Sequence, residues 1–170
     1  NELFLYDLGS GAETRLFPEM GQIGDAQFTP DGKGVILVRT DQNLKDVCNL
    51  MSVDLESGKK VLLTQEPGRQ YGPSVSPDGL RVVYVSGQGW NAKELWQLPL
   101  ASSKGKKRLT TNDFYDTDPE FSPDGTQIVF SALGENSENI YIMNVDGTSR
   151  IAVTTDVSVY NTKPSWSPDG

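Results

Sequence analysis

The chain contains few residues that could carry out chemistry, and their types argue against a catalytic centre. It has no histidine and one cysteine, Cys48. The lack of histidine excludes Ser-His-Asp and Cys-His catalytic arrangements and every metal site that depends on imidazole ligands. The nucleophile pattern Gly-x-Ser-x-Gly and the phosphate-binding P-loop are also missing from the 170 residues. We therefore expect no catalytic residue, no cofactor and no enzymatic activity in this chain.

The densest group of carboxylates lies at Asp116, Asp118 and Glu120. A calcium loop of the EF-hand type that began at Asp116 would need glycine at its sixth position and glutamate at its twelfth. The chain has Phe121 and Gln127 at these positions. Acid–base catalysis by such a pair would need a partner that positions the substrate, and none is evident nearby. We interpret these carboxylates as loop residues and predict no bound metal.

The charge balance also restricts the class of partner. The net charge is −8, and the only basic cluster is 104–108, which falls on an expected hairpin turn. A surface for nucleic acid needs clustered lysine and arginine, so we expect no nucleic-acid partner. We interpret the cluster as a solvated edge that discourages strand addition, with contact to an acidic partner as the alternative. No apolar run approaches ~18 residues, so we expect no membrane insertion.

One tryptophan is a candidate contact residue. Trp90 lies in a loop rich in glycine and asparagine, where an exposed aromatic ring would favour binding of a partner. Trp96 and Trp166 fall within expected strands, so we interpret them as packing residues. Cys48 adjoins apolar residues and is interpreted as a small buried hydrophobe.

The elements that position these residues come from an internal repeat. Ser/Thr-Pro-Asp-Gly occurs four times, at 29–32, 76–79, 122–125 and 167–170, and its aspartates are 47, 46 and 45 residues apart. Proline presets φ and glycine accepts the conformation that ends a tight turn, so each copy predicts a turn. A period in the forties is typical of a propeller blade or of a two-helix solenoid repeat.

The residues between the turns decide between these two architectures. Each turn is followed by a β-branched and aromatic run of strand length, and two further strand-like runs follow in each repeat. No repeat shows a sustained 3.6-residue apolar period, so the helical solenoid is excluded. Each unit is therefore a four-stranded antiparallel meander, the blade of a β-propeller.

The sequence thus predicts an all-β chain of about three and a half propeller blades. The expected units are strands three and four of one blade, then three complete blades, then strand one of a further blade. Their boundaries are 1–19, 24–66, 70–111, 115–155 and 161–170.

At this level of detail the repeats resemble those of the TolB-like β-propellers, which are related to WD repeats. The resemblance rests on the runs DPEFSPDG (118–125), NIYIMNVDG (139–147) and KPSWSPDG (163–170), and it covers essentially the whole chain. It implies a parent ring of six or seven blades and a periplasmic, protein-binding role. Related repeats also form the propeller domain of prolyl-oligopeptidase-type serine peptidases, which is the alternative function.

A binding site is expected where the loops that enter the innermost strands gather at the mouth of the central channel. From the strand order we select as candidate binding residues Asp25, Gln70, Tyr71, Asp116, Asp118, Asn161 and Lys163. This mixed polar, acidic and aromatic set suits a peptide held by hydrogen bonds. Cut blades also leave unpaired strand edges, so we predict that the chain associates with a second copy.

Overall fold

The structure is a computed structural model that describes residues 3–20, 22–40, 44, 47–88, 93–102, 104–111, 115–134 and 136–170. The candidate contact Trp90 lies outside the described residues. Within them the secondary structure is almost entirely β. The strands are β1 (Leu3–Tyr6), β2 (Glu13–Leu16), β3 (Ile23–Phe28), β4 (Gly34–Thr40), β5 (Cys48–Asp54), β6 (Lys60–Leu62), β7 (Arg69–Val75), β8 (Arg81–Gly87), β9 (Lys93–Pro99), β10 (Lys107–Arg108), β11 (Asp116–Phe121), β12 (Gln127–Leu133), β13 (Glu138–Asn144) and β14 (Ile151–Ala152). A short 3-10 helix, η1 (Pro18–Met20), lies between β2 and β3.

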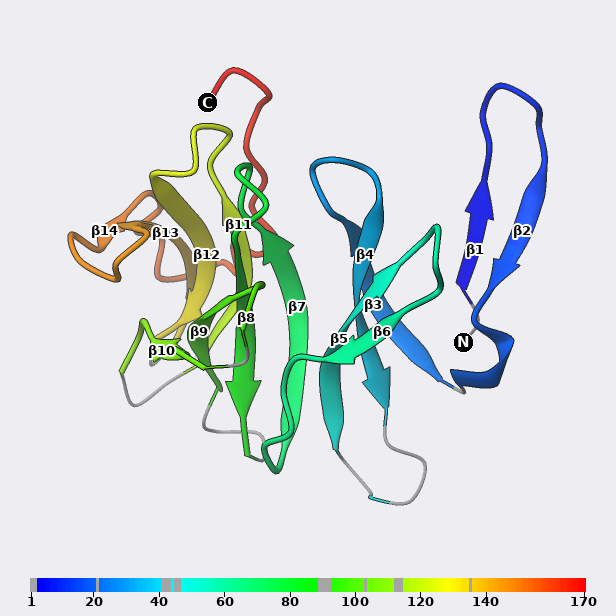
Figure 1. Cartoon of the computed structure of the whole chain (residues 1–170). Coiled ribbons are helices and arrows are strands. Elements are labelled where there is room, and N and C mark those ends of the chain that lie inside the picture. Colours follow the sequence, from blue (N-terminus) through cyan, green and yellow to red (C-terminus); the bar gives the residue numbers. More distant parts are fainter. Residues whose placement is uncertain are drawn as a thin grey trace.

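The strands form consecutive antiparallel groups that stand side by side as a fan (Figure 1). We number them blade 1 (β1–β2), blade 2 (β3–β6), blade 3 (β7–β10) and blade 4 (β11–β14). The innermost strand β7 contacts both β3 and β11, so the first strands of successive blades lie next to one another. The expected all-β fold and partial propeller are confirmed. No helix in the described part of the chain is long and apolar enough to cross a membrane.

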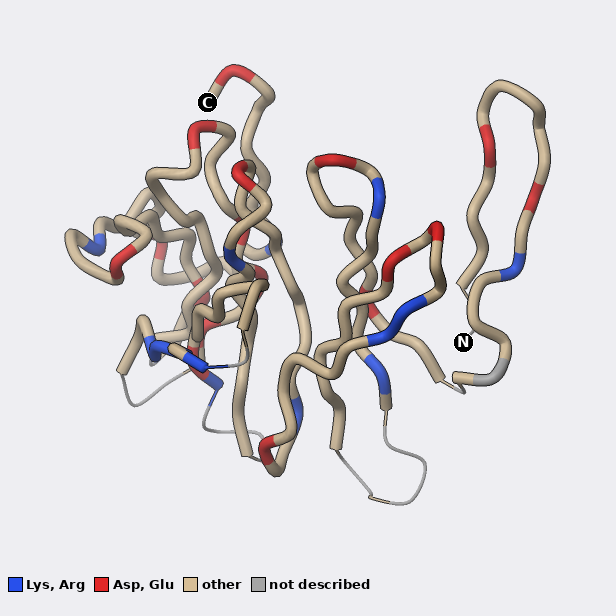
Figure 2. The backbone as a smooth tube through the Cα atoms, in the orientation of Figure 1, with Lys and Arg blue, Asp and Glu red and all other residues tan. Residues whose placement is uncertain are grey.

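The repeated turns form one hydrogen-bond pattern in blades 2 to 4. In blade 4 the Ser122 hydroxyl donates to Asp124 at 2.6 Å and accepts from the backbone N–H of Gln127 at 3.0 Å. The turns at Thr29 and Ser76 repeat both bonds. These hydroxyls lower the pKa of the three turn aspartates, because the bond favours the charged carboxylate. The turns bring acidic residues to one end of the fan (Figure 2).

The hydrophobic core lies between the blades rather than within one sheet. Between blades 3 and 4 the buried side chains are Val83, Val85, Leu95, Phe121, Ile128, Phe130, Ala132 and Met143. A second cluster joins blades 2 and 3 and includes Cys48, which is buried as expected. A third cluster packs the hairpin of blade 1 against blade 2. Each blade is therefore stabilised mainly by its neighbours, as in other repeat architectures.

A ladder of side-chain hydrogen bonds links the innermost strands at equivalent positions. The side-chain oxygen of Gln27 accepts from the backbone N–H of Val75 at 2.7 Å. Ser74, one repeat later, accepts from the N–H of Phe121 at 3.1 Å. One repeat later again, a side-chain oxygen of Glu120 accepts from the backbone N–H of Trp166 at 3.5 Å. This ladder holds the channel-side ends of the blades in register.

The C-terminal segment differs from the expected strand. We predicted strand one of a further blade at 161–170, but the structure has no strand there, only an isolated bridge between Glu138 and Tyr160. The segment lies along blade 4 instead, where the backbone N–H of Lys163 donates to the Ser131 hydroxyl at 3.0 Å. A strand needs a neighbour that completes its hydrogen-bond ladder, and the described residues supply this segment with only the bridge at Tyr160.

Candidate functional site

The innermost strands carry a bulge at the same place in blades 2, 3 and 4, which shifts the register before the last residues of each strand. Asp25, Gly72 and Asp118 occupy equivalent bulge positions, and Lys163 follows one repeat later. Gly72, Asp118 and Lys163 have φ angles of 58°, 51° and 54°, in the left-handed region. Aspartate tolerates this conformation better than most residues because its short side chain bonds locally. Bulges of this kind redirect side chains, here toward a common pocket.

That pocket has a volume of about 250 Å³ and lies where the innermost strands meet the C-terminal segment. Its walls come from three successive repeats and from the segment after Tyr160. The lining residues are Gln27, Gly72, Pro73, Ser74, Asp118, Pro119, Glu120, Lys163 and Pro164. Two carboxylates and one lysine therefore face a pocket whose walls are rich in proline.

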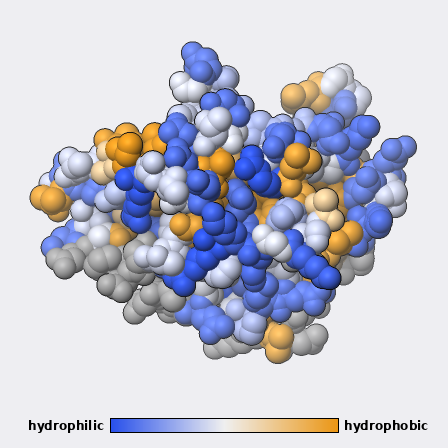
Figure 3. Space-filling view, turned by 60° about the vertical axis from the view of Figure 1, so that its left-hand side comes forward, coloured by the Kyte–Doolittle hydropathy of each residue, from blue (hydrophilic) through white to orange (hydrophobic). Residues whose placement is uncertain are grey.

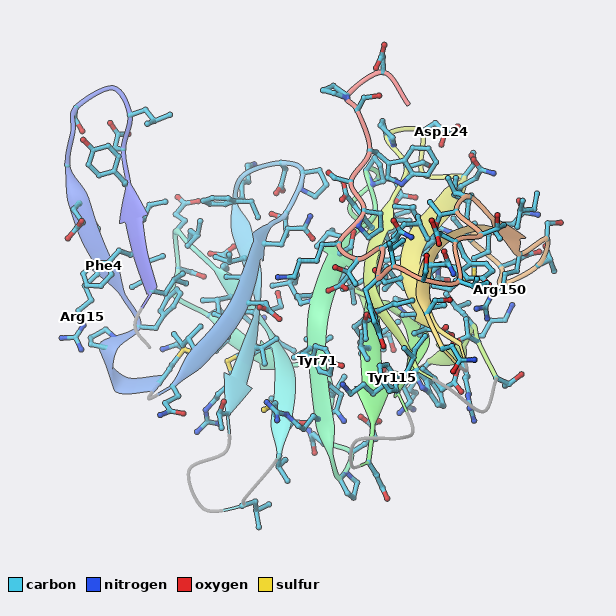
Figure 4. The ribbon with its side chains drawn as sticks, turned by 180° about the vertical axis from the view of Figure 1, so that it is seen from behind. Phe4, Arg15, Tyr71, Tyr115, Asp124 and Arg150 are labelled. Atoms are coloured by element: carbon cyan, nitrogen blue, oxygen red, sulfur yellow. The ribbon has the colours of Figure 1, made fainter. Side chains whose placement is uncertain are left out.

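An aromatic pair lies beside the pocket, at the junction of blades 3 and 4. The ammonium nitrogen of Lys93 is 4.8 Å from the ring centroid of Tyr115 and 5.9 Å from that of Tyr71. Both distances are within the range of a cation–π interaction. Figure 4 shows the two tyrosines near each other and well below Asp124, partway along the blades. The aromatic pair thus lies away from the acidic turns.

Two carboxylates lie next to this pair. The hydroxyl of Thr117 is 3.0 Å from an Asp118 oxygen and 3.4 Å from a Glu138 oxygen. Burial raises the pKa of Glu138, the charge of Asp118 raises it further, and Thr117 and Lys93 oppose the shift. Burial, with the Asp118 charge second, also raises the pKa of Tyr71 to about 12, so its phenol stays protonated at neutral pH. The site is therefore polar, with more negative than positive charge.

The raised pKa of Glu138 predicts a pH-dependent effect of removing its charge. A carboxyl whose folded pKa is raised binds more protons in the folded state, so the free energy of unfolding falls as pH rises above the ordinary value of 4.5. We expect Glu138→Gln to be more stable than the wild type at pH 7, because the amide keeps an oxygen near Thr117 without the charge. The difference should vanish near pH ~3.5, where both states are protonated.

Urea unfolding at the two pH values measures this difference. Glu56→Gln is the matched control, since Glu56 is exposed in the turn after β5. A Glu138→Gln variant that is less stable than the wild type at pH 7 would contradict the prediction.

Five of the expected site residues lie near this region. Asp25 accepts a hydrogen bond from the backbone N–H of Gly72 at 3.0 Å, so it links the bulges of blades 2 and 3. Tyr71, Asp118 and Lys163 lie at the aromatic pair or in the pocket. Asn161 donates its backbone N–H to the carbonyl of Glu138 at 2.8 Å.

The structure does not place Gln70 and Asp116 at the mouth. Both side chains are fully buried. Alternate residues of a strand point to opposite faces, so these two lie on the face opposite to Tyr71 and Thr117. Asp116 forms an ion pair of 3.5 Å with Arg150, whose guanidinium lies over the rings of Phe130 and Tyr141 within blade 4. Neither side chain is therefore part of a surface that a partner can reach.

Sequence reasoning missed four residues of the site: Lys93, Tyr115, Thr117 and Glu138. Lys93 and Glu138 are the first residues of the third strands of blades 3 and 4. Charged residues at this equivalent position of two repeats could have indicated that both belong to the site. The set of expected residues came only from loops that enter the innermost strands. It did not include the first residues of the third strands, where Lys93 and Glu138 lie.

The basic cluster is exposed except for the half-buried Lys106, as expected of a solvated edge, and two of its side chains also contact neighbouring blades. Lys106 pairs with Glu66 of blade 2 and lies 5.0 Å from the ring centroid of Trp96. Lys107 donates to the carbonyl oxygen of Asp146 in blade 4 at 2.8 Å. These side chains tether neighbouring blades. In the described part of the chain, no group of three potential ligands among Cys, Asp and Glu could hold a metal ion.

No model of a known protein family matches the chain. An uncharacterized protein of Agrobacterium fabrum is 29% identical over 84% of this chain and 50% of its own length. The Tol-Pal system protein TolB of Pasteurella multocida is 36% identical over 61% of the chain and 22% of its own length. An uncharacterized peptidase of Bacillus subtilis, YuxL, is 32% identical over 58% and 16%. The chain thus spans half or less of the length of these relatives.

Solved structures of TolB proteins are also similar to this chain. TolB from Acinetobacter baumannii has a TM-score of 0.82 and 25% identity, over 99% of this chain and 41% of that one. A candidate TolB from Agrobacterium tumefaciens has a TM-score of 0.86 and 21% identity, over 99% and 60%. A prolyl endopeptidase has a TM-score of 0.71 with 17% identity, over 92% and 26%, and shares the fold alone.

Proposed function

Because the chain is a partial β-propeller of the TolB-like type, we propose that it binds an extended peptide or protein segment and catalyses no reaction. The binding site is the mouth formed by Tyr71, Lys93, Tyr115, Asp118 and Glu138 together with the adjoining pocket. The observation that carries this proposal is the convergence of two tyrosines and two carboxylates from blades 3 and 4 beside that pocket.

The chemistry of this mouth suits a peptide. Tyrosine supplies a large apolar surface with a polar tip, which is why it is enriched at binding surfaces. The carboxylates can accept hydrogen bonds from peptide N–H groups, and the proline-rich walls of the pocket give apolar contact without a large loss of side-chain entropy. Among the described residues of the mouth, the Thr117 hydroxyl lies near carboxylates, but neither a histidine nor a cysteine accompanies it as in known nucleophile–base pairs, which favours binding over bond cleavage.

Removal of the aromatic pair is expected to weaken peptide binding by about tenfold or more, the size of a binding hot spot. A phage-displayed library of unstructured peptides is panned on the wild-type chain, and enriched peptides are measured by fluorescence anisotropy. Tyr71→Ala and Tyr115→Ala should each lose affinity. Leu80→Ala is the control, because Leu80 is an exposed apolar residue in the turn before β8, outside the mouth and outside the open faces of blades 1 and 4.

Either of two results would contradict the proposal. One is a library that yields no specific peptide. The other is a set of enriched peptides whose affinity is unchanged in both Tyr71→Ala and Tyr115→Ala.

A second function is supported by the likeness to the peptidase YuxL and to prolyl endopeptidase. In this alternative the blades would be the propeller domain of a serine peptidase whose catalytic residues lie outside the 170 residues. The full-length protein would then react with an active-site serine probe such as a fluorophosphonate. Absence of labelling in the full-length protein would remove this alternative.

We also propose that the chain self-associates through its open blade faces. Phe4 and Tyr6 on blade 1 and Ile151 and Val153 on blade 4 are large apolar residues with 47%, 58%, 64% and 56% of their surface exposed. Figure 3, with the side of blade 4 turned forward, shows apolar patches on this surface. Light scattering during size exclusion of the 170-residue chain should give the mass of a dimer. A monomer at micromolar concentration would contradict this proposal.

The likeness to TolB further leads us to propose that the parent protein works outside the cytoplasm. Fractionation of cells that express the full-length protein tests this placement, and recovery in the cytoplasmic fraction alone would contradict it.

A further inference from the structure

We propose that the pocket between the bulges binds a lysine or arginine side chain of the peptide partner, with Asp118 and Glu120 as the counter-charges. This inference rests on the proposed peptide-binding function and names the chemical class that the pocket selects. Three observations support it. They are the shape of the pocket, the unused hydrogen-bond capacity of the two carboxylates, and the position of the Lys93 ammonium at the mouth.

The shape of the pocket suits a long, flexible side chain with a charged tip. Pro73, Pro119 and Pro164 contribute apolar ring atoms to its walls, and its volume of about 250 Å³ is too small for a folded element. The methylene stems of lysine and arginine pack on apolar surface while the charged group remains at a polar site. A cationic side chain could therefore lie on the prolines with its head group at the carboxylates.

The two carboxylates have spare capacity for hydrogen bonds. Asp118 accepts one bond, from Thr117 at 3.0 Å, and Glu120 has only long contacts of 3.4 and 3.5 Å, from the Ser165 hydroxyl and the Trp166 N–H. Neither forms an ion pair with a lysine or arginine of the described chain. A carboxylate has about four acceptor positions, so both can receive donors from a ligand. Charge-assisted bonds of this type are stronger than neutral ones.

The mouth already accommodates a cation beside the pocket. Lys93 places its ammonium over Tyr115 and Tyr71, and its charge offsets a small part of the rise in the pKa of Glu138 that burial and Asp118 cause. The lysine that lines the pocket itself, Lys163, is exposed and forms no ion pair with Asp118 or Glu120. With a net charge of −8 on the chain, the long-range field also favours a basic segment.

The test uses three labelled nonapeptides, Gly-Ser-Gly-Ser-X-Ser-Gly-Ser-Gly, acetylated and amidated, in which X is lysine, norleucine or glutamate. Norleucine keeps an apolar stem without the charge. At low ionic strength we expect the lysine peptide to bind the wild-type chain about tenfold more tightly than the norleucine peptide, and added salt to reduce the difference. The glutamate peptide should bind most weakly.

Isosteric variants assign the effect to the pocket. Asp118→Asn with Glu120→Gln should remove the preference for lysine, and asparagine keeps the left-handed backbone at 118 accessible. Glu13→Gln with Glu56→Gln removes the same charge at exposed positions in blades 1 and 2 and should leave the preference intact. Lys163→Gln should strengthen binding of the lysine peptide, because it removes a like charge.

Equal affinity for the lysine and norleucine peptides would overturn the inference, as would an unchanged preference in the Asp118→Asn, Glu120→Gln variant. If peptides without a basic residue bind and lose affinity in Tyr71→Ala, the peptide-binding function stands and only the choice of a cation is wrong. If none of the three peptides binds, the inference is wrong, whereas the proposed function is decided by the library panning.

Discussion

Replacing Phe130 with alanine is expected to lower the free energy of unfolding by about 3–5 kcal/mol, because it leaves a cavity at the centre of the junction between blades 3 and 4. Phe130 is 0% exposed. Its ring stacks on Tyr141 with centroids 5.9 Å apart, and the Arg150 guanidinium lies 5.1 Å from its centroid. The same junction carries Tyr71 and Tyr115, so we expect peptide affinity to fall together with stability.

Urea unfolding followed by tryptophan fluorescence measures the loss of stability. Phe28→Ala is the control, because Phe28 is 52% exposed at the end of β3 and its truncation should cost less than about 1 kcal/mol. A loss for Phe130→Ala no larger than that for Phe28→Ala would show that blades 3 and 4 do not share a packed core.

Replacing Thr110 with valine is expected to cost about 2–3 kcal/mol, although the two side chains have nearly the same shape. The Thr110 hydroxyl accepts the backbone N–H of Leu95 at 3.0 Å and donates to Glu94 at 2.5 Å. Leu95 and Glu94 are both buried, so water cannot easily replace either bond. Glu94 also pairs with the guanidinium of Arg108 at 2.8 Å, so the Thr110 hydroxyl is one member of a buried polar network.

Thr111→Val provides a control next to this site, since Thr111 is exposed and takes part in no hydrogen bond in the described structure. Thr154 makes the equivalent bonds in blade 4, at 2.9 Å to the Ile140 N–H and to the Asn139 oxygen, but is less buried. We therefore expect Thr154→Val to cost less than Thr110→Val. Equal effects of Thr110→Val and Thr111→Val on the midpoint of thermal unfolding would contradict this explanation.

Much of the fold followed from local chemistry. The tetrapeptide at 122–125 predicts its turn because the hydroxyl, the fixed φ of proline and the glycine all favour one conformation, and the structure shows the hydrogen bonds that this requires. The β-branched run that begins at Val82 predicts a strand for the same local reason. Because the same four-stranded unit recurs along the chain, the repeat then allowed the propeller architecture to be predicted.

The candidate site was less accessible to such reasoning. Tyr71 was selected as a residue of the entry loops and lies within β7 beside Lys93, whereas Gln70, its direct neighbour, is fully buried. The difference is the direction of alternate side chains in a strand, which depends on where the bulge falls at Gly72. The strand expected at 161–170 is also missing, because strand formation there depends on a pairing partner rather than on local preference.

The sequence by itself determined the repeat, the turns, the all-β class and the absence of histidine chemistry, because each depends on residue types at short spacing. Only the tertiary structure decided that Lys93 lies over Tyr115 and that Asp118 and Glu138 share Thr117. These residues lie on different strands and loops of two blades. Their meeting depends on how one blade rotates against the next, and that rotation is set by the packing between sheets and not by any local pattern.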